Sequence, residues 1–384
     1  MIQYGRQDIS QDDIDAVVAV LKSDFLTQGP QVPAFEEAVR NHIGAAHAVA
    51  ANSATSALHM ACAALGLGPG DVLWTSPVTF VASANCARYC GADVDFVDID
   101  SVSYNMSVEK LAEKLAAAKQ AGRLPKIVVP VALCGQPCDM AGIRALADEY
   151  DFAIVEDASH AIGGKYRGNY VGNGDYADIT IFSFHPVKIV TTAEGGLAVT
   201  QDATLADAMR LFRSHGITRD AVKLSKPADG PWYYEQLSLG YNYRMTDMQA
   251  ALGTSQIKRL DEFVARRNEL AARYNEILAH LPLQLPRQHP DAYSARHLYV
   301  VLLEAELAPR HRAIFEGLQS RGIGTNLHYI PVHLQPYYRN LGFEPGQFPQ
   351  AEDYYSRAIT IPLHAVLTHE QQDQVIAALE AELV

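Results

Sequence analysis

Short apolar runs alternate with longer helical segments over the first half of this 384-residue chain, and this alternation limits its fold more than any other feature. Runs that are apolar at nearly every position are typical of strands buried on both faces, as in parallel sheets covered by helices. The sequence therefore predicts an α/β fold around a mostly parallel sheet. The expected strands are residues 46–51, 72–75, 94–97, 127–131 and 152–155, and the helices between them are residues 53–65, 79–89, 108–119 and 140–150.

The chain outside this region is organised differently. Two helices are expected before it, one capped by Ser10 and running to about residue 22, the other at 32–43. The alternation weakens after Gly196, and residues 216–240 form a polar loop. A chain of this length with 48% hydrophobic residues is typical of two domains, and we expect a large domain at 1–260 and a smaller α+β domain at 261–384. The elements expected after the loop are helices at 246–281, at 309–321 and from 368 onward, and strands at 297–303 and 325–329.

Bulk properties exclude several classes of partner. A net charge of −13 argues against binding to nucleic acid or to an anionic membrane. No run approaches the ~18 apolar residues of a membrane span, and the N-terminal residues lack the apolar core of a signal peptide. The odd number of cysteines suits a reducing compartment, so a cytoplasmic protein is expected. Two pairs, Cys86 with Cys90 and Cys134 with Cys138, have a spacing that metal ligands sometimes show, but their apolar surroundings favour buried free thiols and no metal.

Lys188 and Asp157 are the strongest chemical signal. Lys188 follows Ser183-Phe184-His185-Pro186-Val187 and precedes a turn containing Gly195 and Gly196, and Asp157 ends an apolar run. Ligands of open α/β sheets bind at the carboxyl ends of strands, where Asp157 is expected. A lysine that forms a Schiff base and a carboxylate that holds a pyridinium nitrogen are what pyridoxal phosphate (PLP) requires. Alone, Lys188 would be interpreted as a solvated lysine and Asp157 as a helix cap.

Other residues fit the same cofactor, although each has a plainer interpretation by itself. Ser53, Ala54 and Thr55 open a helix, whose free N–H groups suit a phosphate, and the hydroxyl of Ser183 can add to them. Phe80 can stack on a flat ring, and His160 can contact the ring or its 3′-oxygen. The plainer interpretations are an ordinary serine cap, a polar strand end, a core aromatic and a surface histidine.

A polar segment before the 246–281 helix is a candidate for anion binding. It contains Tyr241, Asn242 and Arg244, which follow the long loop. Such groups can reach a phosphate or an anionic substrate, or simply form a loop before a capped helix.

Taken in order, these segments resemble the sugar-nucleotide aminotransferases of the DegT/DnrJ group, which have the fold-type I PLP architecture. Each piece is short, but the resemblance runs nearly end to end and the ordered set is specific. It rests on residues 26–29, 52–58, 183–188, 191–196, 211–216, 241–244, 297–299 and 328–333.

The resemblance implies a role for each candidate residue. Lys188 corresponds to the Schiff-base lysine, Asp157 to the pyridinium partner and His160 to a residue over the ring. The cofactor set is completed by Ser53, Ala54, Thr55, Phe80, Ser183 and Asn242, with Asn242 reaching in from a partner subunit of an obligate homodimer. The residues implied in substrate binding are Thr27, His185, Tyr241, Arg244, His328 and Tyr329.

Within this group the chain is most similar to the pseudaminic-acid branch, partly because Asp157-Ala158-Ser159-His160 carries His where many members have Gln. That branch transfers the amino group of glutamate to the C4 keto group of a UDP-linked 2-acetamido-2,6-dideoxy-4-keto-hexose. The alternatives are a GDP- or dTDP-linked 4-keto sugar, a PLP-dependent sugar dehydratase, and a PLP-binding regulator without catalysis. Lys188 counts against the dehydratase, which has histidine there, and the presence of both Lys188 and Asp157 counts against the regulator.

Overall fold

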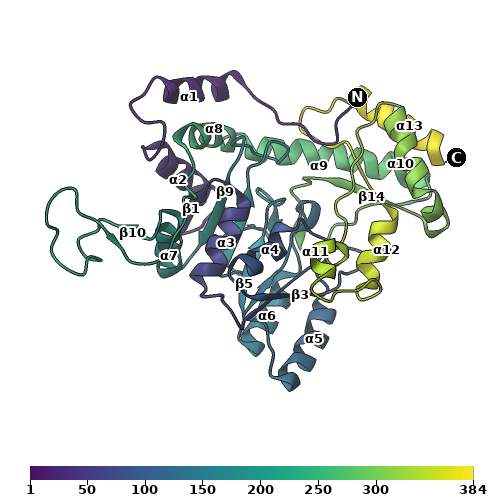
Figure 1. The fold of residues 1–384 in the computed structure, drawn as a ribbon. Coiled ribbons are helices and arrows are strands. Elements are labelled where there is room, and N and C mark those ends of the chain that lie inside the picture. Colours follow the sequence, from purple (N-terminus) through teal and green to yellow (C-terminus); the bar gives the residue numbers. More distant parts are fainter. Residues whose placement is uncertain (384) are drawn as a thin grey trace.

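The computed structural model describes residues 1–383 and is built around a seven-stranded sheet (Figure 1). The strand order is β1-β9-β8-β5-β4-β2-β3. β9 runs antiparallel to both of its neighbours, and the other pairs are parallel, which confirms the mostly parallel sheet. The strands are β1 (His47–Ala51), β2 (Val72–Thr75), β3 (Asp93–Phe96), β4 (Ile127–Val129), β5 (Ala153–Asp157), β8 (Ile179–Ser183) and β9 (Gly196–Thr200).

Helices cover both faces of this sheet, which explains why its strands are apolar at nearly every position. Along β4, Val129 packs in one core with α3 and α4, and its neighbour Val128 packs in another with α5 and α6. Along β1, Val49 joins the first core and Ala50 packs with α2 and α8. The helices are α2 (Gln31–Ile43), α3 (Ala54–Ala64), α4 (Ala82–Tyr89), α5 (Val108–Ala121), α6 (Met140–Tyr150), α7 (Ala203–Arg213) and α8 (Asp247–Ile257).

Two predicted helices differ in the structure. The helix expected at 79–89 begins only at Ala82, which leaves Thr79 and Phe80 in the preceding turn. The single helix expected at 246–281 is two helices, α8 and α9 (Leu260–Ile277), followed by a 3-10 turn. The interruption falls at Arg259, which has φ −104° and ψ 8° and whose guanidinium contacts Asp8 and Asp13.

The C-terminal part contains a three-stranded sheet in the order β12-β14-β15. The strand expected at 325–329 is wrong: Asn326 makes only an isolated bridge to Thr360, and the segment is a loop. β14 lies between β12 and β15, and neither of these strands was predicted. The division into domains near residue 260 stays a prediction. The elements here are β12 (Leu283–Gln284), β14 (Tyr299–Leu303), α10 (His311–Ser320), α12 (Pro349–Arg357), β15 (Ala358–Ile361) and α13 (His369–Leu383).

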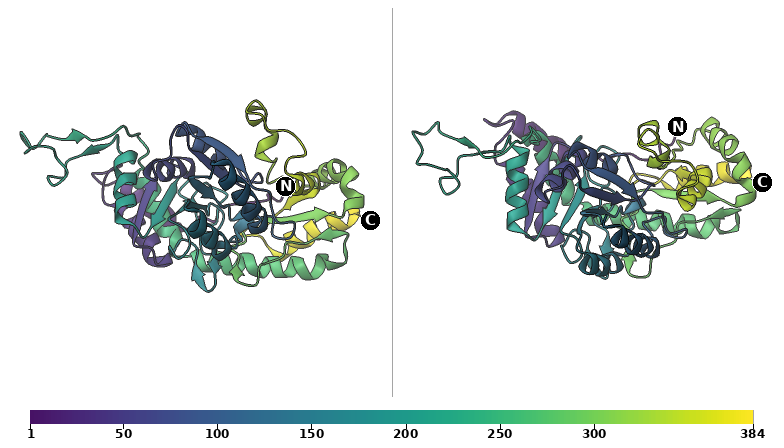
Figure 2. Two further views of the ribbon diagram at one scale, coloured as in Figure 1. Left: turned by 90° about the horizontal axis from the view of Figure 1, so that it is seen from below. Right: turned by 60° about the horizontal axis from the view of Figure 1, so that its bottom comes forward.

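A hairpin arm formed by residues 216–238 extends away from the rest of the molecule (Figures 1 and 2). Its strands are β10 (Ile217–Thr218) and β11 (Glu235–Gln236). Trp232 on this arm is 71% exposed and Leu239 just beyond it is 77% exposed. Helix α1 (Gln11–Leu21), with the predicted Ser10 cap, also exposes apolar side chains, namely Ile14, Val18 and Leu21. Among residues 1–383 no helix is long and apolar enough to cross a membrane.

Candidate active site

A cavity of about 560 Å³ opens where the carboxyl ends of β5 and β8 meet the N-terminus of α3. This is the edge where ligands bind in open α/β sheets. The loop at 326–329 closes the other side, so that loop belongs to the cavity wall and not to a sheet. Predicted site residues on the wall are Ser53, Ala54, Thr55, Phe80, Asp157, His160, Ser183, His185, Lys188, His328 and Tyr329.

Four predicted residues do not line this cavity: Thr27, Tyr241, Asn242 and Arg244. Thr27 forms a bridge to Thr246, and Asn242 forms a bridge to Ser214. These contacts hold the polar segment on the outside of the molecule, where Tyr241 is 39% exposed. Within one chain these residues do not line the cavity. The role of Asn242 in a partner subunit's site and the substrate-binding roles of the other three stay predictions.

The phosphate-binding site predicted at residues 53–55 is the first turn of α3. Ser53 caps the helix, with its Oγ accepting a hydrogen bond from Ser56 N at 3.1 Å. Ala54 and Thr55 are the first helical residues, whose N–H groups have no acceptor within a helix. Together with the positive end of the helix dipole, they suit a phosphate. Gly196 packs directly against the backbone of Ser53 and Ala54, and a Cβ there would overlap it.

Asp157 ends β5, is 5% exposed, and faces the cavity. Its Oδ1 accepts a hydrogen bond from Ser159 N at 3.1 Å, and its Oδ2 accepts one from Ser83 Oγ at 2.6 Å. Two donors from different segments thus fix the orientation of the carboxylate.

Lys188 lies in the turn that joins β8 to β9, with its backbone N–H bonded to His185 O at 2.9 Å. Burial lowers the pKa of Lys188 to about 8, and the Asp157 carboxylate acts against this shift. An amine with this pKa is available in both neutral and protonated forms near neutral pH, as a nucleophile and proton carrier must be.

Both ring nitrogens of His160 are already engaged by the protein. Nδ1 accepts a hydrogen bond from Cys134 N–H at 3.3 Å, and Nε2 lies 3.2 Å from the Tyr329 hydroxyl. Burial holds the pKa of His160 well below its usual range, so the ring is neutral. Nδ1 is then the acceptor and Nε2 carries the proton. A contact from His160 to the ring of a cofactor stays a prediction, and it would use the face of the imidazole.

The cavity also includes residues that sequence reasoning missed. His297 lies with its ring centroid 4.4 Å from that of His160, and Tyr4 from the N-terminal segment has its ring 5.2 Å from His328. The segment with Tyr4 is fixed by Ile2, which bonds to Gly322 and Gly324. Thr79 also lines the cavity. It precedes Ser83 by four residues, a spacing that is visible in the sequence.

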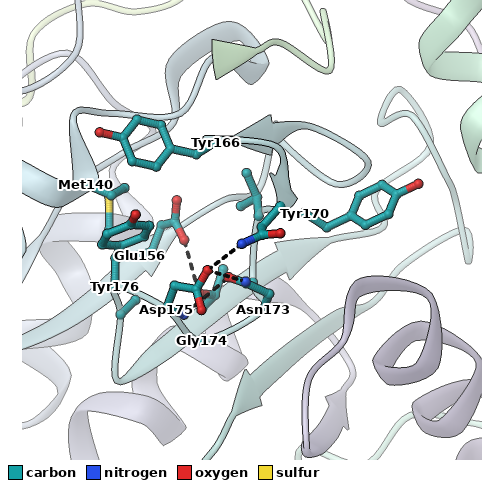
Figure 3. A pocket seen from close by; sticks show the side chains of 13 residues that line it. Met140, Glu156, Tyr166, Tyr170, Asn173, Gly174, Asp175 and Tyr176 are labelled. Carbon is teal, nitrogen blue, oxygen red and sulfur yellow. Dashed lines mark hydrogen bonds between the residues drawn. The ribbon is translucent and has the colours of Figure 1, made fainter. Parts of the chain in front are cut away.

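Figure 3 shows a second, much smaller pocket of about 20 Å³. It lies on the opposite face of β5 from the large cavity, because successive side chains of a strand alternate between faces. Glu156, Tyr166 and Asp175 are among its lining residues. Its volume suits about one water molecule, so it cannot hold a cofactor.

The large cavity contains what PLP needs: an amine of lowered pKa, an anchored carboxylate and a helix N-terminus for the phosphate. The sequence model of the DegT/DnrJ/EryC1/StrS aminotransferase family matches residues 7–380, and the chain belongs to this family.

Relatives match over nearly the whole chain. The UDP-4-amino-4,6-dideoxy-N-acetyl-beta-L-altrosamine transaminase of Campylobacter jejuni is 39% identical over 365 residues, which cover 95% of this chain and 93% of that protein. The structure of Helicobacter pylori PseC, an aminotransferase involved in the biosynthesis of pseudoaminic acid, matches with a TM-score of 0.91 and 32% identity, covering 100% of this chain and 99% of that one. The putative sugar aminotransferase Spr1654 of Streptococcus pneumoniae, in its PMP form, matches with a TM-score of 0.90 and 30% identity, covering 100% and 99%.

The protein is therefore a PLP-dependent sugar-nucleotide aminotransferase of fold type I, which confirms the predicted fold class, enzyme class and cofactor.

Proposed function

We propose that this enzyme transfers the amino group of glutamate to the C4 keto group of a UDP-linked 2-acetamido-2,6-dideoxy-4-keto-hexose. The observation that carries the proposal is the near full-length similarity to the C. jejuni transaminase named for a UDP-linked altrosamine, supported by the likeness to H. pylori PseC. The 39% identity leaves room for a different nucleotide, so GDP- and dTDP-linked 4-keto sugars are the alternatives.

The residues of the cavity have complementary tasks in this proposal. Ser53, Ala54, Thr55 and Ser183 hold the phosphate of PLP, Asp157 holds its ring nitrogen, and Phe80 packs against the ring. PLP, when bound, supplies an aldehyde and a ring that takes up electrons.

Lys188 Nζ is the group that moves the proton during amino transfer. Its pKa of about 8 lets the neutral amine accept a proton from one carbon bonded to the transferred nitrogen and return it to the carbon on the other side of that nitrogen, a 1,3-proton shift, without a large free-energy cost. His185, His328 and Tyr329 line the remainder of the cavity and are assigned to the sugar nucleotide.

The acting form in this proposal is a homodimer with shared sites. The residues that line the cavity, all from the described part of the chain, include no arginine, and Lys188 is their only lysine. A sugar diphosphate and the two carboxylates of glutamate need more positive charge than Lys188 supplies. Asn242 and Arg244 of the partner subunit would complete the site. The exposed apolar residues of the arm and of α1 supply surface that such contact would bury.

The test is an amino-transfer assay with glutamate and a panel of UDP-, GDP- and dTDP-linked 4-keto sugars, with the product separated by chromatography. We expect the UDP-linked N-acetylated sugar to react with the highest kcat/KM. A higher value for a GDP- or dTDP-linked sugar would overturn the substrate assignment while leaving the enzyme class intact. Replacing glutamate with aspartate in the same assay tests the amino donor separately.

A further inference from the structure

Two buried hydroxyl groups form a chain behind the carboxylate of Asp157. Thr79 Oγ1 lies 2.7 Å from Ser83 Oγ, and Ser83 Oγ lies 2.6 Å from Asp157 Oδ2. Thr79 is 2% exposed and Ser83 is fully buried. We propose that Thr79 and Ser83 are positioning residues that hold the Asp157 carboxylate correctly aimed at the ring nitrogen of PLP.

The direction of the protons in this chain follows from the acceptors. Ser83 has one hydroxyl proton, and its possible acceptors include Asp157 Oδ2 at 2.6 Å and Phe80 O at 3.4 Å. A charged acceptor at the shorter distance forms the stronger hydrogen bond, so Ser83 donates to Asp157. Thr79 must then donate to Ser83, because the Ser83 proton is already used. Both hydroxyl dipoles therefore point toward the carboxylate.

These two hydrogen bonds are important because Asp157 is buried, and a buried charge needs hydrogen-bond donors. Ser159 N donates to Oδ1 and Ser83 donates to Oδ2, and no lysine or arginine is bonded to the carboxylate in the described residues. Without Ser83 the carboxylate would lose the donor to its Oδ2, would keep only the donor Ser159 N, and would reorient more freely. A carboxylate that is poorly oriented holds a protonated ring nitrogen less well, and the ring then takes up electrons less readily.

The local fold explains how the two hydroxyls come into line. Helix α4 begins at Ala82, so Ser83 lies in its first turn and Thr79 lies in the turn before it. β5 places Asp157 against this start. The inference rests on the proposed role of Asp157, and its test must separate the two.

The experiment compares Ser83→Ala and Thr79→Val with Thr79→Ser, which keeps the hydroxyl. Thr75→Val is a matched control. Thr75 is also buried and its Oγ1 donates to Val129 O at 2.8 Å, but it lies in β2 and makes no hydrogen bond to Thr79, Ser83 or Asp157. Two properties are measured for each protein: the Kd of PLP for the apoprotein, by absorbance titration, and the protonation of the ring nitrogen, by NMR of isotope-labelled PLP.

We expect Ser83→Ala to raise the Kd of PLP by about 10- to 100-fold, the factor that one hydrogen bond to a charged group corresponds to. The ring nitrogen should lose protonation at neutral pH in the same variant. Thr79→Val should act in the same direction with a smaller effect, and Thr79→Ser and Thr75→Val should match the parent in both measurements.

Asp157→Asn separates failure of this inference from failure of its premise. If Asp157→Asn changes the protonation of the ring nitrogen and Ser83→Ala does not, the positioning role is overturned and the role of Asp157 stands. If neither variant changes it, Asp157 is not the ring-nitrogen partner and the inference fails with its premise.

Discussion

Glu156 and Asp157 are consecutive residues of β5, and their carboxylates lie on opposite faces of the sheet. Successive side chains of a strand alternate between faces, so Asp157 reaches the large cavity and Glu156 reaches the small pocket. Figure 3 shows Glu156 among the residues of the small pocket. Both residues are 5% exposed. Two buried acids in one strand thus have separate surroundings, and they should respond differently to substitution.

Glu156→Gln is expected to stabilise the protein above neutral pH. Burial raises the pKa of Glu156 from 4.5 to about 7, so the folded state binds this proton more tightly than the unfolded state. Stability contributed by this group is therefore present at low pH and is lost as the pH rises from about 4.5 to about 7. Glutamine has no such loss, and the variant should gain up to a few kcal/mol at about pH 8, since each pKa unit corresponds to about 1.4 kcal/mol.

Denaturant unfolding of parent and variant across this pH range measures the difference, which should vanish toward about pH 4.5. Glu149→Gln, at an exposed position, should follow the parent at every pH. Parallel profiles for Glu156→Gln and the parent would show that burial does not raise this pKa.

The apoprotein should capture PLP faster as the pH rises to about 8 and no faster beyond it. Only the neutral amine of Lys188 attacks the aldehyde, and its pKa is lowered to about 8. Below that value the rate should rise about tenfold for each pH unit. Stopped-flow absorbance records the rate, and an increase that continues to about pH 10 would mean that the amine has its ordinary pKa.

Lys188→Ala should show no visible absorption band from PLP joined to the protein, and borohydride should leave no PLP covalently attached. The variant should also not complete a turnover. Lys126→Ala, which removes a half-exposed lysine paired with Asp71, should behave as the parent in both respects. Transamination by Lys188→Ala at the parental rate would remove Lys188 from the mechanism.

Gly196→Ala should weaken PLP binding by about 10- to 100-fold, because a misfitting methyl group costs about 1–3 kcal/mol. Gly196 pairs with Ala51 in β1 and Ser183 in β8, and an added Cβ would overlap the backbone of Ser53 and Ala54. The first turn of α3 would have to move away from the phosphate. Gly68→Ala is the matched control, since a Cβ there meets open space. Equal Kd values for both variants would contradict the proposal that the first turn of α3 binds the phosphate.

Mixing two inactive variants should restore activity if the sites are shared between subunits. Lys188→Ala leaves Asn242 intact, and Asn242→Ala leaves Lys188 intact, so each mixed dimer has one complete site. Random exchange should recover roughly a quarter of the parental activity, because half of the dimers are mixed. Activity that stays at the sum of the two separate proteins, with subunit exchange verified by mass spectrometry, would place every catalytic group in one chain.

The parts of the fold that sequence predicted well are those fixed by local pattern. Apolar runs predicted the strand at 72–75 and a strand at 127–131, which ends at residue 129 in the structure. The Ser10 cap with Asp13 predicted the helix α1. Lys188 and Asp157 were predicted to share a cofactor because of their chemistry. The structure brings both to one cavity, since Asp157 ends β5 and Lys188 follows the neighbouring β8.

The failures come from contacts between distant residues. Nothing near Arg259 predicts that Asp8 and Asp13 will bind it where α8 ends. The 325–329 segment has strand-like composition, but its side chains serve the cavity wall, and β15 supplies the sheet pairing instead. Likewise, the link from Ser83 to Asp157 joins residues 74 positions apart, which no local pattern reveals.

Tyr4 contributes to the cavity wall only a few residues from the start of the chain, and Ile2 anchors that segment to the loop at 322–324. An affinity tag fused before Met1 would be joined to the same short segment that places Tyr4 in the cavity wall. Recombinant material for the experiments above should therefore carry its tag elsewhere, and trimming of the first residues during expression would mimic a catalytic defect.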